Sequence, residues 1–167
     1  MTLHAWMLSQ SGIPVIYSGD EIGQLNDYSY HQDGEKWDDS RYVHRGDFQW
    51  DMAELRNDGT TRQGKVFQGL RRLEKLRAME PCFDAGADTW VEESGNPHVF
   101  ALCRRKDNRE LICLYNFSRE FAHASIQREG GYTELMYEIH HEQIKDVELY
   151  PCGFAWLLRD TEQESAG

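Results

Sequence analysis

The spacing of hydrophobic positions predicts helices in the first half of the chain. Residues 3–10 form a short apolar stretch that ends at Ser11-Gly12, a pair typical of a helix C-terminus. Residues 63–79 repeat apolar side chains at helical spacing until Glu80-Pro81 ends the pattern. The apolar side chains of this second stretch are Val66, Phe67, Leu70, Leu73 and Leu76.

The segment between these helices has two parts of different character. Residues 13–18 are apolar without polar alternation, which is typical of a strand covered on both faces, as in a parallel sheet or barrel. Residues 19–62 are rich in Asp, Gly, Asn, Tyr and Trp and show no sustained periodicity. Long irregular loops are uncommon in compact domains and tend to be functional, so we expect residues 19–62 to carry the site.

From about residue 85 the pattern changes to short β-type runs separated by turn residues. The runs are 89–93, 98–105, 111–117, 121–127, 132–139, 146–150 and 153–159. The second and third flank a polar turn, as the strands of a hairpin do. We predict an α+β chain: a helix, strand, long loop and helix over residues 1–84, then an antiparallel β-sandwich over residues 85–167.

Charge and composition exclude several classes of partner. The 18 Lys and Arg against 29 Asp and Glu give a net charge of −11, which repels nucleic acids and anionic membranes. No apolar run approaches the roughly 20 residues of a membrane helix. The N-terminus lacks the basic start of a signal peptide. We therefore expect a cytoplasmic protein whose partners are neutral small molecules or other proteins.

The cysteines and histidines predict no metal site. Cys82, Cys103, Cys113 and Cys152 show neither a CxxC pair nor a zinc-site spacing. Cys103 and Cys113 lie symmetrically about the predicted hairpin turn, which leaves a disulfide open beside the simpler interpretation as buried thiols. Adjacent histidines, His140 and His141, diverge on a strand and should not share an ion.

The segment from Gly12 to Gly23 carries the most specific signal. It reads Gly-Ile-Pro-Val-Ile-Tyr-Ser-Gly-Asp-Glu-Ile-Gly and resembles the eighth barrel strand of the alpha-amylase superfamily, glycoside hydrolase family 13. The following loop, with Asp38-Asp39-Ser40-Arg41 and Arg56-Asn57-Asp58, resembles that of the amylosucrase branch. The resemblance implies the last βα unit of a (β/α)8 barrel in residues 1–84 and the C-terminal β-domain in residues 85–167.

The resemblance also implies a function. The parent enzyme would be a retaining glucosyl transferase or hydrolase acting on sucrose or α-glucans through a nucleophile and an acid, without a cofactor. In the family these carboxylates follow earlier barrel strands, upstream of Met1, so the chain would contain no catalytic residue and be inactive alone. Its expected partners are the sugar and the missing N-terminal part of the barrel.

Asp20 and Glu21 are adjacent acids at the C-terminal end of the predicted strand, where barrel enzymes keep their sites. Neighbours on an extended backbone point to opposite sides, so these acids should not form a facing catalytic pair. The resemblance implies that they hold the strand-eight loop in place.

Arg41 and Arg56 are the main candidates for substrate binding. A guanidinium presents rigid donors suited to sugar hydroxyls, and Asp38 and Asp39 could hold Arg41 in position. The resemblance places Arg41 at the acceptor side, while Arg56 would close the glucose pocket with an upstream acid. The alternatives are a surface ion pair for Arg41 and a bond from Arg56 to Asp58.

Trp37 is the aromatic candidate for substrate binding. Aromatic faces stack on the apolar faces of sugar rings, but the loop aromatics could instead pack the loop on itself. These aromatics are Tyr28, Tyr30, Trp37, Tyr42, Phe48 and Trp50.

Two rival functions remain open. One is a non-catalytic carbohydrate-binding domain that uses the loop aromatics, and the other is a structural domain that stabilises a barrel. An uncovered strand at 13–18 would be an exposed edge, so homo-oligomer formation through this segment is also expected.

Overall fold

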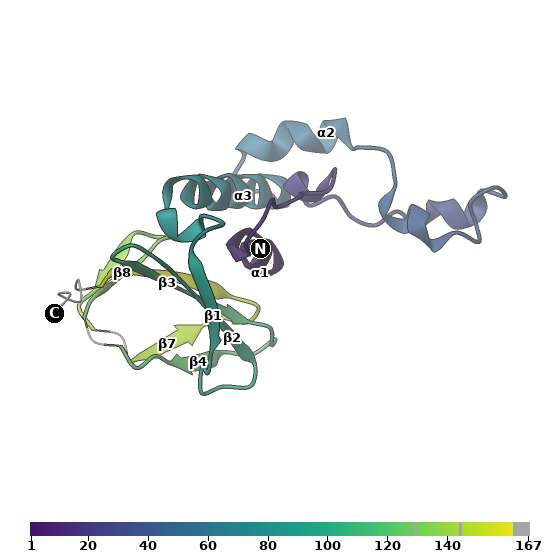
Figure 1. The fold of residues 1–167 in the computed structure, drawn as a ribbon. Coiled ribbons are helices and arrows are strands. Elements are labelled where there is room, and N and C mark those ends of the chain that lie inside the picture. Colours follow the sequence, from purple (N-terminus) through teal and green to yellow (C-terminus); the bar gives the residue numbers. More distant parts are fainter. Residues whose placement is uncertain (129, 144, 162–167) are drawn as a thin grey trace. The chain divides into compact units, whose positions relative to one another are not determined.

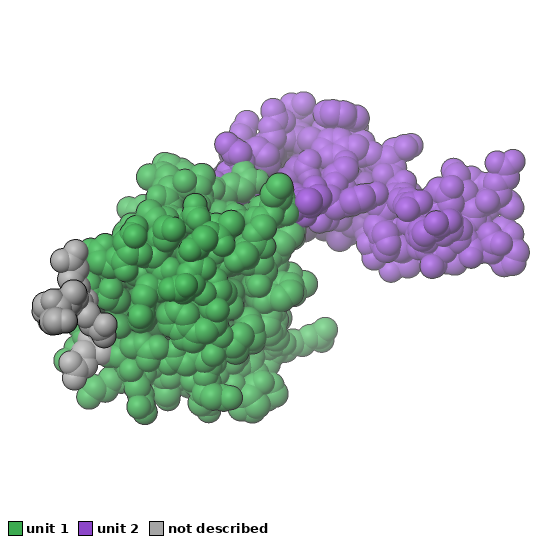
Figure 2. Space-filling model, viewed as in Figure 1, with its two compact units in different colours: residues 1–14, 72–167 green, residues 15–71 purple. Residues whose placement is uncertain are grey.

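The computed structural model describes residues 1–128, 130–143 and 145–161. They form two compact units, drawn in different colours in Figure 2. The first combines Met1–Pro14 with Arg72–Gly167, and the second is Val15–Arg71. The predicted domain boundary between residues 84 and 85 concerns the parent enzyme and stays a prediction. No helix in the part of the chain that the structure describes is long and apolar enough to cross a bilayer.

The two longer helices lie where the apolar spacing predicts them. They are α1 (Thr2–Ser9), α2 (Trp50–Ala53) and α3 (Arg62–Met79), with 3-10 turns at Asp20–Ile22, Ser29–Gln32, Ser40–His44, Glu54–Asn57 and Pro81–Phe83. The pattern therefore predicts α1 and α3 to within one residue at each end. The short helix α2 has no sequence counterpart because a single turn is too brief to show a helical period.

The second half of the chain is antiparallel β-structure, as predicted. Its strands are β1 (Asp88–Glu92), β2 (Val99–Lys106), β3 (Arg109–Asn116), β4 (Ala122–Ser125), β5 (Tyr132–Glu134), β6 (Ile139–His141), β7 (Asp146–Leu149) and β8 (Phe154–Asp160). The larger sheet has the order β1-β2-β3-β8-β5-β6, and β4 pairs with β7 in a separate small sheet. The run predicted as one strand over 132–139 is two strands, because Glu138 adopts a positive φ and the Glu134 carboxylate accepts the Tyr137 N–H at 2.7 Å.

The central strands of the larger sheet, β2, β3 and β8, are buried on both faces. One face packs against β4 and β7, and the other packs against α1, the 3-10 turn at Pro81–Phe83 and part of α3 (Figure 1). The first core includes Ala101, Cys103, Ile112, Leu114, Ala124 and Leu157, and the second includes Leu8, Leu73, Phe83, Cys113, Tyr115 and Trp156. Successive side chains of β2, β3 and β8 alternate between these cores, as the period of an extended strand requires.

The hairpin register decides the state of the cysteines. Lys106 pairs with Arg109 across a turn in which Asp107 has a φ of 53°. Cys103 therefore lies opposite Ile112, and its side chain and that of Cys113 enter different cores. A disulfide between them is excluded, and all four cysteines are free thiols. Burial raises the pKa of the Cys113 thiol to about 12.

The predicted strand over residues 13–18 is not formed in this structure. Residues 13–17 have no regular secondary structure, and the Ile13 side chain is 92% exposed. A β-strand exists through hydrogen bonds to neighbouring strands, and none pairs with this segment within the ranges that the structure describes. The expectation of a strand covered on both faces is therefore wrong for the chain by itself.

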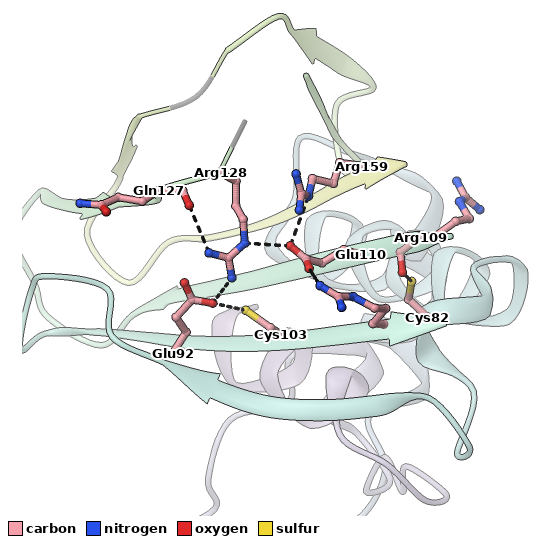
Figure 3. A network of polar contacts seen from close by, with 9 residues as sticks. Cys82, Glu92, Cys103, Arg109, Glu110, Gln127, Arg128 and Arg159 are labelled. Carbon is pink, nitrogen blue, oxygen red and sulfur yellow. Dashed lines mark hydrogen bonds and ion pairs between the residues drawn. The ribbon is translucent and has the colours of Figure 1, made fainter. Parts of the chain in front are cut away.

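A buried charge network joins the end of β2, the start of β3 and the end of β8, as Figure 3 shows. The fully buried Glu110 carboxylate accepts hydrogen bonds from Arg105 at 2.5 Å, Arg128 at 3.1 Å and Arg159 at 3.2 Å. Burial by itself would raise the pKa of Glu110, but these guanidinium groups hold it below its ordinary value. Glu92 also pairs with Arg128. The network thus replaces water around a carboxylate that the sheet buries.

Candidate functional site

The motif after residue 17 folds into a tight turn. Asp20 N–H donates to the Tyr17 carbonyl at 3.0 Å, and the Gly19 carbonyl accepts from both Ile22 at 3.2 Å and Gln24 at 2.9 Å. Gly19 has a φ of 92°, which a residue with a Cβ rarely adopts. The turn therefore requires glycine at this position, as the motif supplies.

The two adjacent acids of the motif differ in their surroundings. One Glu21 carboxylate oxygen lies 3.1 Å from the Gly19 N–H and accepts its hydrogen bond. The Asp20 side chain is exposed. Glu21 is therefore engaged with the backbone of its own turn, which is a structural contact.

Gln24 joins the start of the long loop to its middle. Its side-chain amide donates to the Asp47 carbonyl at 3.0 Å and accepts from the Gln49 N–H at 3.2 Å. The Asp27 N–H adds a bond of 2.8 Å to the Val43 carbonyl. These contacts close residues 24–49 on themselves. No local sequence pattern marks Gln24, because its partners lie more than twenty residues away in the chain.

Arg41 is held by Asp39. Asp39 precedes the 3-10 turn at Ser40–His44 and accepts the Arg41 N–H at 3.0 Å. The Arg41 guanidinium donates to the same carboxylate through Nε at 2.8 Å and Nη2 at 2.6 Å. These hydrogen bonds lower the pKa of Asp39 to about 2. Asp38, also expected to hold Arg41, is exposed and makes no bond to it.

This pair is compatible with ligand binding. The Arg41 side chain is 69% exposed, and the bonds to Asp39 use only Nε and one Nη2 position of its five N–H donors. The pair fixes the guanidinium plane, so the remaining donors have a defined direction. A fixed fork of donors suits two neighbouring hydroxyl groups of a sugar.

Arg56 has a different partner from the one the sequence suggests. Its Nη1 donates to the Ala53 carbonyl at 2.9 Å, at the end of α2. Asp58 instead accepts both the N–H and the hydroxyl of Thr60, at 2.9 and 2.7 Å. The structure therefore does not bring Arg56 and Asp58 together, nor does any bond of Arg56 join it to Arg41 within the described ranges.

The loop aromatics are more exposed than self-packing would require. Trp37 is 59% exposed and Trp50 is 75% exposed, although Phe48 lies edge-on to Trp50 with ring centroids 4.7 Å apart. Tyr28 is also exposed. Phe48 contacts Trp50 and Lys36 lies over the Tyr42 ring, while Trp37 and Trp50 remain more than half exposed.

Comparison with solved structures identifies the fold. The chain resembles a variant of AmyP in complex with maltotriose at 17% sequence identity and a TM-score of 0.71, over 95% of this chain and 34% of that one. It resembles trehalulose synthase MutB from Pseudomonas mesoacidophila MX-45 at 19% identity and a TM-score of 0.70, over 93% and 37%. A maltogenic amylase from S. marinus matches at 21% identity and 0.63, over 95% and 19%.

These matches confirm the predicted resemblance to alpha-amylase-type enzymes at the level of the fold. The chain has the α+β architecture, with its antiparallel sheet, of the C-terminal domain of such enzymes. No protein-family model matches the chain. The chain spans between 19% and 37% of the length of the solved structures named above.

Proposed function

We propose that the chain is the C-terminal part of a retaining α-glucosyl transferase or hydrolase acting on sucrose or α-glucans. The observation that carries the proposal is the structural match over at least 93% of the chain to enzymes of this type. The motif from Gly12 to Gly23 supports it independently, because fold similarity does not depend on that short sequence.

Within this enzyme, residues 13–18 would be the eighth barrel strand and residues 19–62 a wall of the acceptor subsites. The exposed guanidinium of Arg41 and the exposed face of Trp37 support this role. The amylosucrase branch is the assignment that the Asp38-to-Arg41 segment favours. AmyP has been solved with maltose, and a MutB variant with sucrose, which motivates these sugars as probes.

The chain itself would be inactive. Retaining glycosidases need a nucleophile and an acid whose carboxyl groups lie roughly 5–5.5 Å apart. Asp20 and Glu21 would not provide this pair, and the bond of Glu21 to the turn backbone supports a structural role for it. The parent enzyme would work by double displacement without a cofactor, using carboxylates contributed by the rest of its barrel.

A non-catalytic carbohydrate-binding role is a second candidate, favoured by the exposure of Trp37 and Trp50. A barrel-stabilising role is a third, favoured by the exposure of Ile13 and Val15, since apolar side chains in such an extended segment are suited to burial by a partner. Self-association through residues 13–18 follows from the same exposure.

Sugar titration of the purified chain tests the role of the loop. We expect maltotriose to shift the Trp37 indole N–H resonance saturably, and Trp37→Leu or Arg41→Gln to weaken binding by at least fivefold. Trp6→Leu is the matched control, because Trp6 is partly exposed on α1, outside the loop. Binding that neither loop variant weakens would contradict the assignment.

Incubation of the same chain with sucrose tests its inactivity. We expect no release of glucose or fructose above a protein-free blank. Sucrose cleavage that is abolished by Asp20→Asn or Glu21→Gln would overturn the conclusion that these acids are structural.

A further inference from the structure

Arg104 on β2 is a buried cation bonded entirely to oxygens of neutral groups. Its Nε donates to the Cys82 carbonyl at 2.6 Å, Nη2 to the Asp84 carbonyl at 2.8 Å, and Nη1 to the Ser9 carbonyl at 2.9 Å and the Ser11 hydroxyl at 3.3 Å. The side chain is fully buried, and no carboxylate pairs with it among the residues that the structure describes. Burial lowers the pKa of Arg104 from its ordinary value.

Such a residue is not explained by packing alone. A buried charge without a counter-ion is costly, and an apolar side chain of similar volume would fill the same space without that cost. What an apolar side chain lacks is the planar fork of donors, which fixes several carbonyl groups at once. Arg104 therefore contributes by holding these carbonyl groups in a defined arrangement.

Arg77, in the last turn of α3, binds the neighbouring carbonyls of the same segment. It donates to the Leu8 carbonyl, to the Gln10 carbonyl at 3.0 Å and to the Gly12 carbonyl at 2.8 Å. The last carbonyls of a helix have no partner within the helix, and cations near them are favoured by the helix dipole. Together Arg77 and Arg104 satisfy the carbonyls of residues 8, 9, 10 and 12.

The segment bound in this way is the exit from α1. Gln10 leaves the helix with an extended backbone, and Gly12 has a φ of 100°, so the chain changes direction here before residues 13–17. No other backbone hydrogen bond holds residues 11–14 in the described part of the chain. The two guanidinium groups are close enough for their charges to repel each other, which is a cost of placing both on one turn.

We propose that Arg77 and Arg104 form a clasp through which the sandwich and the last turn of α3 set the direction of the chain as it leaves α1. In this arrangement the sandwich fixes the backbone of residues 8–12, and it need not touch the sugar. The connection to a sugar site rests on the proposed function, whereas the clasp itself does not.

The clasp is tested by the distance between two nitroxide labels in the full chain, measured by pulsed electron paramagnetic resonance. One label is attached to Cys152, the exposed native thiol, since the other three cysteines are buried. The second is attached at Ile13→Cys, just past the clasp. The labelled parent is expected to give one narrow distance peak, and Arg77→Met to widen that distribution at least twofold.

Lys75→Met is the matched control. It removes one positive charge from an exposed position on the same helix and is expected to leave the peak narrow. If circular dichroism shows that Arg77→Met does not fold, Arg77→Lys decides, because a single ammonium group keeps the charge but does not span the carbonyls of residues 8 and 12. A narrow peak at the parent distance in the folded Arg77 variants would overturn the proposal.

The measurement needs no sugar. A narrow peak in the Arg77 variants would contradict the clasp but would not bear on the result of the sugar titration. Failure of maltotriose to bind would contradict the proposed sugar-binding role of the loop but would not bear on the clasp.

Discussion

At the scale of single residues, the fold depends most on Glu110. Its carboxylate is fully buried and neutralises part of the charge of Arg105, Arg128 and Arg159. We expect Glu110→Gln to lower the free energy of unfolding by about 3 kcal/mol, since the arginines would keep their charge without the anion. Urea denaturation measures this change.

The control for this substitution is Glu148→Gln. Glu148 is exposed and lies 3.6 Å from His123 in a surface pair, so its change should stay below about 0.5 kcal/mol. Equal effects of the two substitutions would contradict the importance assigned to burial at Glu110.

Glu110 also predicts a pH dependence. Because its folded pKa lies below the ordinary value of 4.5, the stability it contributes is fully present above pH 4.5 and is lost as the pH falls through the folded pKa. We expect the free energy of unfolding to fall below pH 4.5, and to fall less steeply in Glu110→Gln. Urea titrations from about pH 6 downward check this; identical slopes would contradict it.

Sequence reasoning reached some of these residues and missed others for a definite reason. Arg41 and its acidic neighbours can be predicted from their adjacency in the sequence, although only the geometry of the turn selects Asp39 over Asp38. The partners of Glu110 lie 5, 18 and 49 residues away, and no local pattern reports such contacts.

At the scale of elements, α3 is fixed by its buried stripe. Leu73 is fully buried in the core beneath the larger sheet. We expect Leu73→Ala to lower the free energy of unfolding by about 2–4 kcal/mol, through lost burial and the cavity left behind. Met79→Ala is the control on the same helix, because Met79 is exposed. A comparable loss in both variants, by thermal or urea unfolding, would contradict this packing.

The elements that the sequence predicts correctly are those with their own periodicity. The helices and most strands of the second half bury one face or both against neighbours in the same chain, so their apolar pattern matches their structure. Residues 13–18 carry an equally clear strand pattern but pair with no strand among the residues that the structure describes. An apolar pattern indicates which side chains a segment can bury, whereas a strand forms only where a partner strand is present to hydrogen-bond with it.

At the scale of the whole molecule, the chain exposes apolar and aromatic side chains that its own fold does not bury. The side chains of Ile13 and Val15 are exposed in an extended segment, and the loop after them presents Trp37, Arg41 and Trp50 to solvent. The sandwich, by contrast, is well packed on both faces of its larger sheet. This contrast is what a C-terminal part of a larger barrel enzyme would show.

The candidate site is therefore only partly predictable from these residues. The motif and loop were found because short specific sequences carry them, and Glu21 and Arg41 take local contacts that sequence proximity suggests. The nucleophile, the acid and the expected partner of Arg56 would come from residues outside this chain under the proposed function. No pattern within the chain specifies them.

The most direct test of this account is the coding sequence immediately upstream of the codon for Met1. We predict that the reading frame continues through a (β/α)8 barrel that carries an Asp after its fourth strand and a Glu after its fifth. The loop residues would then become subsite positions of a sugar-transferring enzyme. A translation start at Met1, with no barrel encoded before it, would contradict the account and make the chain an autonomous non-catalytic domain.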